Sequence, residues 1–270
     1  MTPPSPAPIL VFDSGLGGLT VAREILALTP QYRLLYYGDT ACFPYGTKPA
    51  EQVIARVLER IDMLEQRYRP ALIVIACNTA STVVLPALRA RTRTPVVGVV
   101  PAVKPAAAMT DSGVIGLLAT PGTVLRDYTR QLIEQFAGHC EVVSVGSNEL
   151  VLLAEGKLLG RPVTTPQLLP ILERFAHHPR HDDIDTIVLA CTHFPLLRQE
   201  LAAAYDRPVL WLDSGRAIAQ RVRSLLGDAD PHGLAAARGH RALFSARLPT
   251  LDQLRPYLAA MGIEPEQDPL

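Results

Sequence analysis

The fold is decided by two stretches of the chain, ALIVIACNTAS at 71–81 and TIVLACTHFPLL at 186–197. Each begins with an unbroken apolar run, continues with the dipeptide Ala-Cys, and ends in a segment that can start a helix. Apolar runs of Val, Ile and Leu without polar alternation are typical of strands covered on both faces. The two stretches therefore predict two buried strands, each followed by a cysteine and a helix N-terminus.

Further short apolar runs of the same kind occur throughout the chain: ILVF at 9–12, LLYY at 34–37, PVVGVV at 95–100, VIGLLA at 114–119, EVVSV at 141–145 and PVLWL at 208–212. Amphipathic, helix-like segments lie between the runs, among them 50–68, 124–136 and 165–176. Repeated alternation of strand and helix predicts an α/β fold built on mainly parallel sheets flanked by helices.

The likeness of the two opening stretches predicts two pseudo-symmetric lobes. The tripeptide Asp-Ser-Gly also occurs twice, at 13–15 and 213–215, each time after an apolar strand. Prolines punctuate the chain at VVPAVKP, 99–105, which suggests a boundary there. We expect a first lobe of residues 1–100 plus 212–270 and a second of residues 101–211, with the active site in the cleft between them.

Composition excludes several classes of protein. The chain has 270 residues, 48% apolar and 19% charged, which is enough for a sizeable core and typical of soluble globular proteins. Lys plus Arg and Asp plus Glu both number 26, so the net charge suggests neither a nucleic-acid nor a membrane partner. No apolar run approaches the roughly 18 residues of a membrane span. The start has no secretory pattern, so residues 1–8 are interpreted as a short disordered leader, and a cytoplasmic protein is expected.

The chain has four cysteines, at 42, 77, 140 and 191, and only three lysines, at 48, 104 and 157. No Cys-x-x-Cys pair or zinc-like spacing occurs, which disfavours disulfides and a structural metal. Free cysteine often packs as a small hydrophobe, and Cys42 and Cys140 are interpreted in that way. Cys77 and Cys191 differ from them because each ends an apolar run and is followed by polar residues, which indicates a reactive role for the thiol.

Polar residues directly follow four of the predicted strands: Asp13-Ser14-Gly15, Gly38-Asp39-Thr40, Cys77-Asn78-Thr79 and Cys191-Thr192-His193. In open parallel sheets, ligands bind beyond the carboxyl ends of the strands. A helix N-terminus after each cysteine would favour a thiolate, and the nearby amides and hydroxyls would hold a carboxylate. We expect these segments to converge on one cleft.

Two thiols on opposite walls of a cleft suit the inversion of a stereocentre, in which one group removes a proton and the other delivers one to the opposite face. Pyridoxal phosphate would normally activate such a carbon, through a lysine. None of the three lysines lies in a convincing pocket, which favours a cofactor-free route. Asp13, Asp39 or His193 could orient or exchange protons with a cysteine, and the sequence leaves open which reaches which.

Two competing patterns are weaker. GLGGLT at 15–20 is similar to a dinucleotide-binding loop, but Thr20 replaces its third glycine and Asp13 would repel the pyrophosphate. A cluster near 177–183, namely His177, His178, His181, Asp182 and Asp183, could ligate a metal. Pro179 and Arg180 lie within it, so it is interpreted as a solvated loop, and no metal site is predicted.

Six motifs together resemble the glutamate racemase family, cofactor-independent bacterial enzymes of the aspartate/glutamate racemase superfamily. They are VFDSGLGGLTV (11–21), GDTACFPYGTK (38–48), ACNTAS (76–81), LLATPGTVLRDY (117–128), LACTHFPLL (189–197) and LDSGRAIAQRV (212–222). They occur in the order found in the family, and the similarity extends from about residue 9 to about residue 225.

The resemblance implies roles for particular residues. Cys77 and Cys191 match the two catalytic acid/base cysteines, and Asp13 and His193 match the groups thought to assist them. Residues matching the substrate-binding and pocket-lining pairs are Asp13 and Ser14, Tyr45 and Gly46, Asn78 and Thr79, Thr120 and Thr123, and Thr192 and His193. The resemblance also implies glutamate as substrate, no cofactor, a homodimer, and supply of D-glutamate for peptidoglycan.

The sequence departs from the family pattern in three places. Cys42 stands where an arginine is common, Arg126 where a serine is, and Gly146-Ser147-Asn148 replaces a Cys-Pro, although Glu155 keeps the acidic end of that stretch. Two alternative functions stay open at this point. One is a racemase of another acidic amino acid such as aspartate, and the other is a regulatory binding protein on the same fold, for instance one acting on a topoisomerase.

Overall fold

A computed structural model describes residues 7–227 and 239–266 of the chain. Most of the expected leader, residues 1–6, lies outside the described residues, as do residues 228–238 and 267–270 of the expected first lobe. The chain folds into two units. Unit 1 contains the residues up to Val99 and those from Gly215 onward, and unit 2 contains Val100–Ser214.

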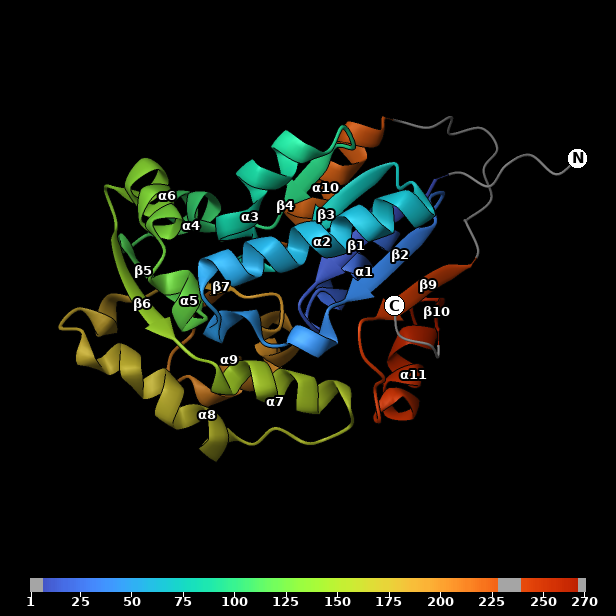
Figure 1. Ribbon diagram of the computed structural model, residues 1–270. Helices are drawn as coiled ribbons and strands as arrows, with labels where there is room; N and C mark the ends of the chain where they lie inside the picture. Colours follow the sequence, from blue (N-terminus) through green and yellow to red (C-terminus); the bar gives the residue numbers. More distant parts are fainter. Residues whose placement is uncertain (1–6, 228–238, 267–270) are drawn as a thin grey trace, which may run out of the picture. The chain divides into compact units, whose positions relative to one another are not determined.

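Unit 1 is built on a six-stranded sheet in the order β10-β9-β2-β1-β3-β4, and every neighbouring pair is parallel (Figure 1). Its strands are β1 (Ile9–Asp13), β2 (Leu34–Gly38), β3 (Leu72–Ile75), β4 (Val96–Gly98), β9 (His240–Phe244) and β10 (Ile263–Pro265). Its α-helices are α1 (Leu19–Leu28), α2 (Ala50–Tyr68), α3 (Asn78–Arg91), α10 (Gly215–Leu226) and α11 (Leu251–Ala259).

Helices cover this sheet because its central strands are apolar on both faces. Every residue of β1, β2 and β3 is buried. Leu10, Phe12, Ile73 and Ile75 pack in one cluster with the buried stripe of α2, which recurs at helical spacing from Val53 to Leu64. Helices α1 and α10 pack against each other in the same unit.

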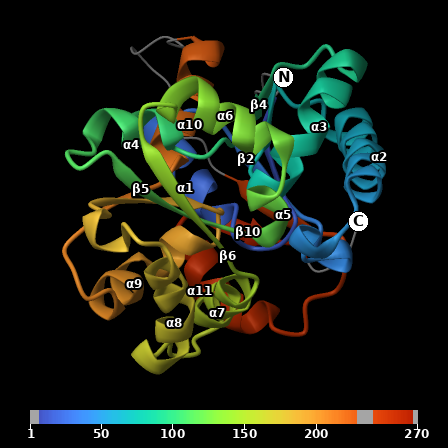
Figure 2. The same ribbon diagram turned by 90° about the vertical axis from the view of Figure 1, so that its left-hand side faces the viewer.

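Unit 2 is built on a four-stranded parallel sheet in the order β6-β5-β7-β8. Its strands are β5 (Val114–Ala119), β6 (Glu141–Gly146), β7 (Thr186–Ala190) and β8 (Leu210–Leu212). Its α-helices are α4 (Val103–Met109), α5 (Pro121–Val124), α6 (Asp127–Ala137), α7 (Glu149–Leu158), α8 (Thr165–Leu172) and α9 (Arg198–Ala204). Helices α4 and α6 lie side by side and share a core cluster with β5 and β7 (Figures 1 and 2).

The two sheets repeat one topology. If the strands are numbered along the chain within each unit, the first four strands of both sheets lie in the order 2-1-3-4. Strands β9 and β10 extend only the sheet of unit 1. The predicted α/β class with two parallel sheets flanked by helices is therefore confirmed. Each of the eight apolar runs forms a strand, and the third strand of each unit is the one that precedes Cys77 or Cys191.

The predicted helices agree less closely at their ends. Helix α2 has the predicted bounds, but the helix predicted over 124–136, α6, begins only at Asp127. A separate turn, α5, precedes it, and the side chain of Thr120 caps that turn by accepting from the amide of Thr123. Helix α8 ends at Leu172, and a 3₁₀ turn, Glu173–His177, completes the segment predicted as 165–176.

Candidate active site

In each unit, the candidate residues lie where the strand order reverses. The second strand lies on one side of the first strand and the third strand on the other, so a crevice is expected between the carboxyl ends of strands one and three. Asp13 ends β1, and Cys77 follows β3 in unit 1. Thr120 follows β5 and Cys191 follows β7 in unit 2, where Ala119 is in register with Ala190. The predicted site residues thus form two groups, one in each unit.

Cys77 lies at the N-cap of α3 in extended backbone conformation. Its thiol is buried, with 5% of the residue exposed, and it donates to the Oγ of Ser14 at 3.7 Å. The unpaired amides and dipole of a helix N-terminus stabilise negative charge. The predicted placement of this cysteine between a buried strand and a helix is therefore what the structure has.

The first turn of α3 also contains an unsatisfied acceptor. Asn78 and Thr79 are both buried, and no hydrogen-bond partner for the Asn78 Oδ1 occurs within the described residues. A buried polar atom without a partner costs free energy, which a bound ligand can recover. The side-chain oxygen of Asn78 is thus an acceptor available to a ligand with an N–H or O–H group.

Asp13 is fully buried at the end of β1 and accepts from the amide of Gly15 at 3.0 Å. A methyl group on Gly18 would lie 2.7 Å from the Asp13 Cβ and 3.2 Å from the Cβ of Ala76, which places Asp13 close to the residue that precedes Cys77. The Asp13 carboxylate thus takes up the Gly15 amide and places a negative charge at this loop, where a pyrophosphate would be repelled. The dinucleotide-loop alternative is not supported.

Tyr45 and Gly46 lie in a 3₁₀ turn, η2 (Tyr45–Thr47), between β2 and α2. Tyr45 is buried, and its hydroxyl donates to Asp39 Oδ2 at 2.6 Å. Burial, together with the charges of Asp39 and, to a smaller extent, Cys77, raises the pKa of Tyr45 above its usual value. Tyr45 is therefore a neutral donor directed at Asp39.

In unit 2, the backbone after Cys191 differs from the backbone after Cys77. Cys191 is buried with 6% exposed, but the chain then forms a 3₁₀ turn, η5 (Phe194–Leu197), before α9 begins at Arg198. The helix N-terminus predicted directly after Cys191 is thus a 3₁₀ turn. The hydroxyls of Thr120 and Thr123 lie 3.0 Å apart, and these residues and Thr192 are all buried.

His193 connects Cys191 to a carboxylate. Its Nδ1 lies 3.8 Å from the Cys191 Sγ, and its Nε2 lies 3.1 Å from Glu155 Oε1. Because an ionised carboxylate only accepts, Nε2 carries a proton, and in neutral His193 this leaves Nδ1 to accept from the thiol. His193 is therefore the titratable side chain that lies beside Cys191 in unit 2.

Glu155 is the functional candidate to which sequence reasoning gave no role. It lies on α7; in the departure Gly146-Ser147-Asn148, Gly146 ends β6, and Ser147 and Asn148 connect the strand to this helix. The Ser147 hydroxyl accepts from the amide of Leu150 and donates to Glu149. The substituted stretch thus still starts a capped helix that delivers Glu155 to His193.

The remaining reactive residues are engaged elsewhere. The four cysteines form no disulfide in the described part of the chain, and Cys42 and Cys140 are half-buried against core clusters, as their packing interpretation requires. Lys157 pairs with Glu200 at 2.6 Å, and the Nζ of Lys48 donates to the carbonyl of Pro44. The third lysine, Lys104, lies over the ring of Phe136.

The histidine cluster near 177–183 forms surface ion pairs. His178 contacts Glu141 at 3.1 Å, and Arg180 bridges Glu141 and Asp183. Within residues 7–227 and 239–266, no three His, Cys, Asp or Glu side chains gather closely enough to hold a metal ion. The same residues include no helix long and apolar enough to cross a membrane.

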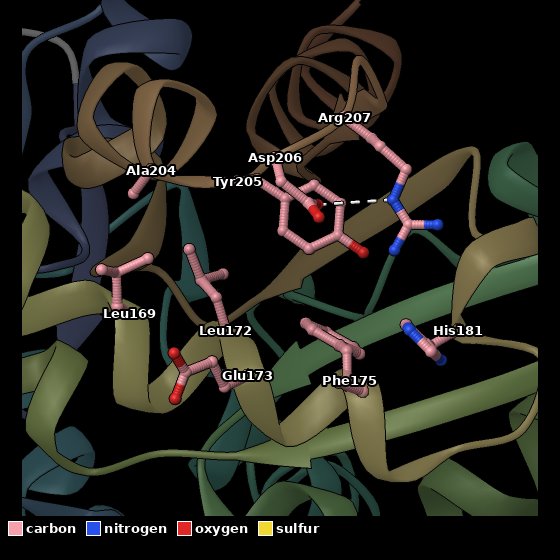
Figure 3. Close-up of a pocket in the computed structure, with 10 residues that line it drawn as sticks. Leu169, Leu172, Glu173, Phe175, His181, Ala204, Tyr205, Asp206 and Arg207 are labelled. Atoms are coloured by element: carbon pink, nitrogen blue, oxygen red, sulfur yellow. Dashed lines mark hydrogen bonds and ion pairs between the residues drawn. The ribbon is translucent and has the colours of Figure 1, made fainter.

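A separate pocket of about 210 Å³ lies beside α8 and the end of α9 (Figure 3). Its lining consists of Leu169, Leu172, Glu173, Phe175, Ala176, His181, Ala204, Tyr205, Asp206 and Arg207. Arg207 lies over the ring of Tyr205 and pairs with Asp182 at 2.8 Å and Asp206 at 3.3 Å. Its charge is therefore already neutralised, and none of the predicted site residues lines this pocket.

The chain thus has a buried thiol after the third strand of each of two similar α/β units. Residues 13–222 match the sequence model of the Asp/Glu/Hydantoin racemase family, and the chain belongs to that family. The resemblance found from the motifs is thereby confirmed, as is the prediction of an amino-acid racemase, a kind of isomerase.

Individual relatives are named more narrowly. The chain is 48% identical to the glutamate racemase of Klebsiella pneumoniae (strain 342) over 262 residues, which are 97% of this chain and 92% of the relative. It is 51% identical to the glutamate racemase of Pectobacterium carotovorum over 227 residues, 84% and 79% of the two chains. A crystal structure of Escherichia coli glutamate racemase with L-glutamate and the activator UDP-MurNAc-ala matches with a TM-score of 0.88 and 45% identity, covering 96% of this chain and 97% of the other.

Proposed function

We propose that this protein is a glutamate racemase that interconverts L- and D-glutamate with two cysteines and no cofactor. The observation that carries the proposal is the repeated placement of a buried thiol after the third strand of each sheet, with a polar partner beside it. The substrate assignment is supported by the names of relatives that match nearly the whole chain.

In the proposed mechanism, the two expected lobes, residues 1–100 with 212–270 and residues 101–211, enclose one glutamate. Cys77 and Cys191 lie on opposite sides of its Cα. The thiolate of one cysteine takes the α-proton, and the electron pair left on Cα takes a proton from the thiol of the other. Each turnover thus exchanges the protonation states of the two sulfurs, which lets the same pair act in either direction.

His193 and Asp13 are proposed to restore the resting protonation of the thiols. His193 is supported by the contact of its Nδ1 with the Cys191 Sγ and by the Glu155 carboxylate behind it. Asp13 is supported by its place beside Ala76, next to Cys77. Each cysteine thus has a titratable residue near it in its own unit: the His193 Nδ1 is 3.8 Å from the Cys191 Sγ, and Asp13 lies beside the residue that precedes Cys77.

Glutamate is proposed to be held by local donors and acceptors. The first-turn amides of α3 suit a carboxylate, and the unpartnered Asn78 Oδ1 suits the substrate ammonium group. Ser14, Gly46 and Thr79 complete the proposed contacts of unit 1. The proposed contacts of unit 2 are Thr120, Thr123 and Thr192. Because Lys48, Lys104 and Lys157 all have other partners, the route without a Schiff base to lysine is favoured.

The wider biological setting is part of the same proposal. The family resemblance supports a cytoplasmic homodimer that supplies D-glutamate for peptidoglycan. The E. coli relative was crystallised with L-glutamate and UDP-MurNAc-ala as activator. Measurement of the mass of the protein in solution would test the homodimer. Growth of a D-glutamate auxotroph that carries its gene would test the supply of D-glutamate.

The mechanism is tested by replacing each thiol in turn. We expect Cys77→Ser and Cys191→Ser each to lower racemisation at least about 100-fold, since general acid and base groups contribute about 10²–10⁴-fold. Cys140→Ser is the matched control and should keep full activity. Full activity in both catalytic variants would refute the two-thiol mechanism.

The substrate is tested on a panel that includes both enantiomers of aspartate, followed by chiral chromatography. Faster conversion of aspartate than of glutamate would reassign the substrate within the family. If the protein exchanged the α-proton of no acidic amino acid, a regulatory binding protein would replace the enzyme as the best assignment.

A further inference from the structure

The segment that carries Tyr45 and Gly46 has little regular structure of its own. Residues 39–49 connect β2 to α2 through two short 3₁₀ turns, η1 (Thr40–Cys42) and η2. A loop of this kind keeps one conformation only if other contacts fix it, because its backbone is not held in a ladder. Side chains must therefore anchor it.

The anchor is the fully buried carboxylate of Asp39, which accepts four hydrogen bonds. Arg56, from α2, donates to both oxygens, with its Nε 2.8 Å from Oδ2 and an Nη 2.7 Å from Oδ1. The hydroxyl of Tyr45 donates to Oδ2 at 2.6 Å, and that of Ser245 donates to Oδ1 at 2.6 Å. The backbone of Asp39 is also fixed, since its amide donates to the carbonyl of Asp13 and its carbonyl accepts from the amide of Cys42.

Four donors use the full accepting capacity of a carboxylate. Burial alone would raise the pKa of Asp39, but the hydrogen bonds from Arg56, Ser245 and Tyr45 outweigh it and hold the pKa below its usual value. Asp39 therefore stays ionised and has neither a proton to give nor a vacant position to receive one. Of the roles left open by the sequence, orienting the site fits this carboxylate and exchanging protons with a cysteine does not.

Ser245 brings a distant part of the chain to the same loop. It directly follows β9, and its Oγ accepts from the amide of Ala41 at 2.9 Å while donating to Asp39. Its own amide donates to the carbonyl of Gly38, and the next amide, of Ala246, donates to the Thr40 hydroxyl. The end of β9 thus clamps the start of the loop at several points.

We propose that Arg56 and Ser245 are positioning residues that, through Asp39, hold the Tyr45–Gly46 turn in its substrate-binding conformation. The carboxylate links three elements, α2, the end of β9 and the η2 turn. Strand β9, which extends the sheet of unit 1 alone, thereby gains a role in the site. The assignment of the turn to substrate rests on the proposed function, whereas the clamp itself does not.

The clamp is tested by hydrogen exchange on the full-length protein, which needs no substrate. In Arg56→Lys and Ser245→Ala we expect the amides of residues 40–48 to exchange about 10-fold faster or more, with those of β1 and α3 unchanged. Glu59→Gln is the matched control, because it weakens only two surface contacts of a largely exposed carboxylate, with Arg56 at 3.8 Å and with Arg60 at 3.2 Å, and leaves the bonds of Asp39 in place. Unchanged exchange of the loop in both variants would overturn the clamp.

The positioning role is tested by steady-state kinetics with both glutamate enantiomers. Arg56→Lys and Ser245→Ala should each raise KM about 10-fold with kcat within about three-fold, the pattern of lost uniform binding. The isotope effect with α-deuterated glutamate should equal that of the wild type. A fall in kcat with a raised isotope effect would overturn the positioning role, because it would place the cluster in proton transfer. A wild type that converts no glutamate would refute the proposed function and leave the exchange result standing.

Discussion

Replacement of Glu155 by Gln tests whether the carboxylate behind His193 contributes to proton transfer at Cys191. Gln keeps the size of the side chain and an oxygen that can accept from the His193 Nε2, now 3.1 Å from Glu155 Oε1, but it removes the negative charge. That charge favours the imidazolium, which forms when His193 takes the thiol proton of Cys191. The substitution should therefore slow formation of the Cys191 thiolate.

The size of the effect follows from the burial of the two groups. The His193 side chain is 3% exposed and that of Glu155 is 20% exposed, so water screens the interaction only in part. Hydrogen bonds to charged groups contribute about 1.5–3 kcal/mol, and since Gln keeps a neutral acceptor, a loss of about 1–2 kcal/mol is expected. This corresponds to a fall in kcat of about 5- to 30-fold.

The assay is conversion of each glutamate enantiomer, followed by circular dichroism, with α-deuterated and ordinary substrate. The two enantiomers have equal free energies in water, so kcat/KM must be the same in both directions for every variant. The α-deuterium isotope effect can differ between the two directions. In Glu155→Gln it should be larger than in the wild type for the direction in which Cys191 acts as the base.

Glu149→Gln is the matched control, because Glu149 lies on the same helix and pairs with Arg174 at the surface, and Gln keeps an oxygen that can accept from the Ser147 hydroxyl. Its activity should equal that of the wild type. If Glu155→Gln also kept wild-type kcat and isotope effects, the proposed relay from Glu155 through His193 to Cys191 would be wrong.

Three further substitutions test the packing and electrostatics that support the site. Gly18→Ala should lower activity and destabilise the protein by about 1–3 kcal/mol in denaturant unfolding, because its methyl group would lie 2.7 Å from the Asp13 Cβ. If the variant kept both the activity and the stability of the wild type, the Asp13 loop would be shown to move without cost. Asp185→Asn should lower stability by about 1–2 kcal/mol at pH 7, since Asp185 accepts from Thr110 and the amides of Asp111 and Ser112. Although burial opposes it, these bonds hold the pKa of Asp185 at about 2, so the difference between the two proteins should shrink as the pH falls below about 4. Burial lowers the pKa of His240, whose Nδ1 accepts from the amide of Leu34, so the unfolded chain binds more protons than the folded one. The melting temperature should therefore fall as the pH drops below about 6.5, and it should fall less steeply in His240→Gln. An equal dependence of melting temperature on pH in the two proteins would count against a buried neutral imidazole.

The sequence predicted those parts of the molecule that depend on local pattern. Short, unbroken apolar runs such as 71–77 and 186–191 are typical of strands in the middle of a sheet covered on both faces, and both contain such a strand. The cysteines after them were identified because strand ends are where ligands bind in such sheets. The match of the 50–68 segment to α2 has the same origin, a long stripe of apolar residues at helical spacing.

Contacts between distant residues could not be predicted in this way. Glu155 and His193 are 38 positions apart, and Ser245 and Asp39 are 206 apart, so no spacing rule connects either pair. The strands β9 and β10 were missed because HRALF and IEP are short and include charged or proline residues. The parallel pairing of β9 with β2, and of β10 with β9, depends on tertiary packing, which overrides local propensity.

Incubation of each glutamate enantiomer with the wild-type protein in heavy water tests the two-thiol mechanism most directly. Two groups on opposite faces, each exchanging with solvent, should place deuterium on Cα of the newly formed enantiomer from the first turnovers, while the unconverted substrate gains deuterium more slowly. The same pattern is expected from either enantiomer. A product that keeps the original α-hydrogen would mean that one group carries the proton between faces, and would contradict a mechanism that uses both Cys77 and Cys191.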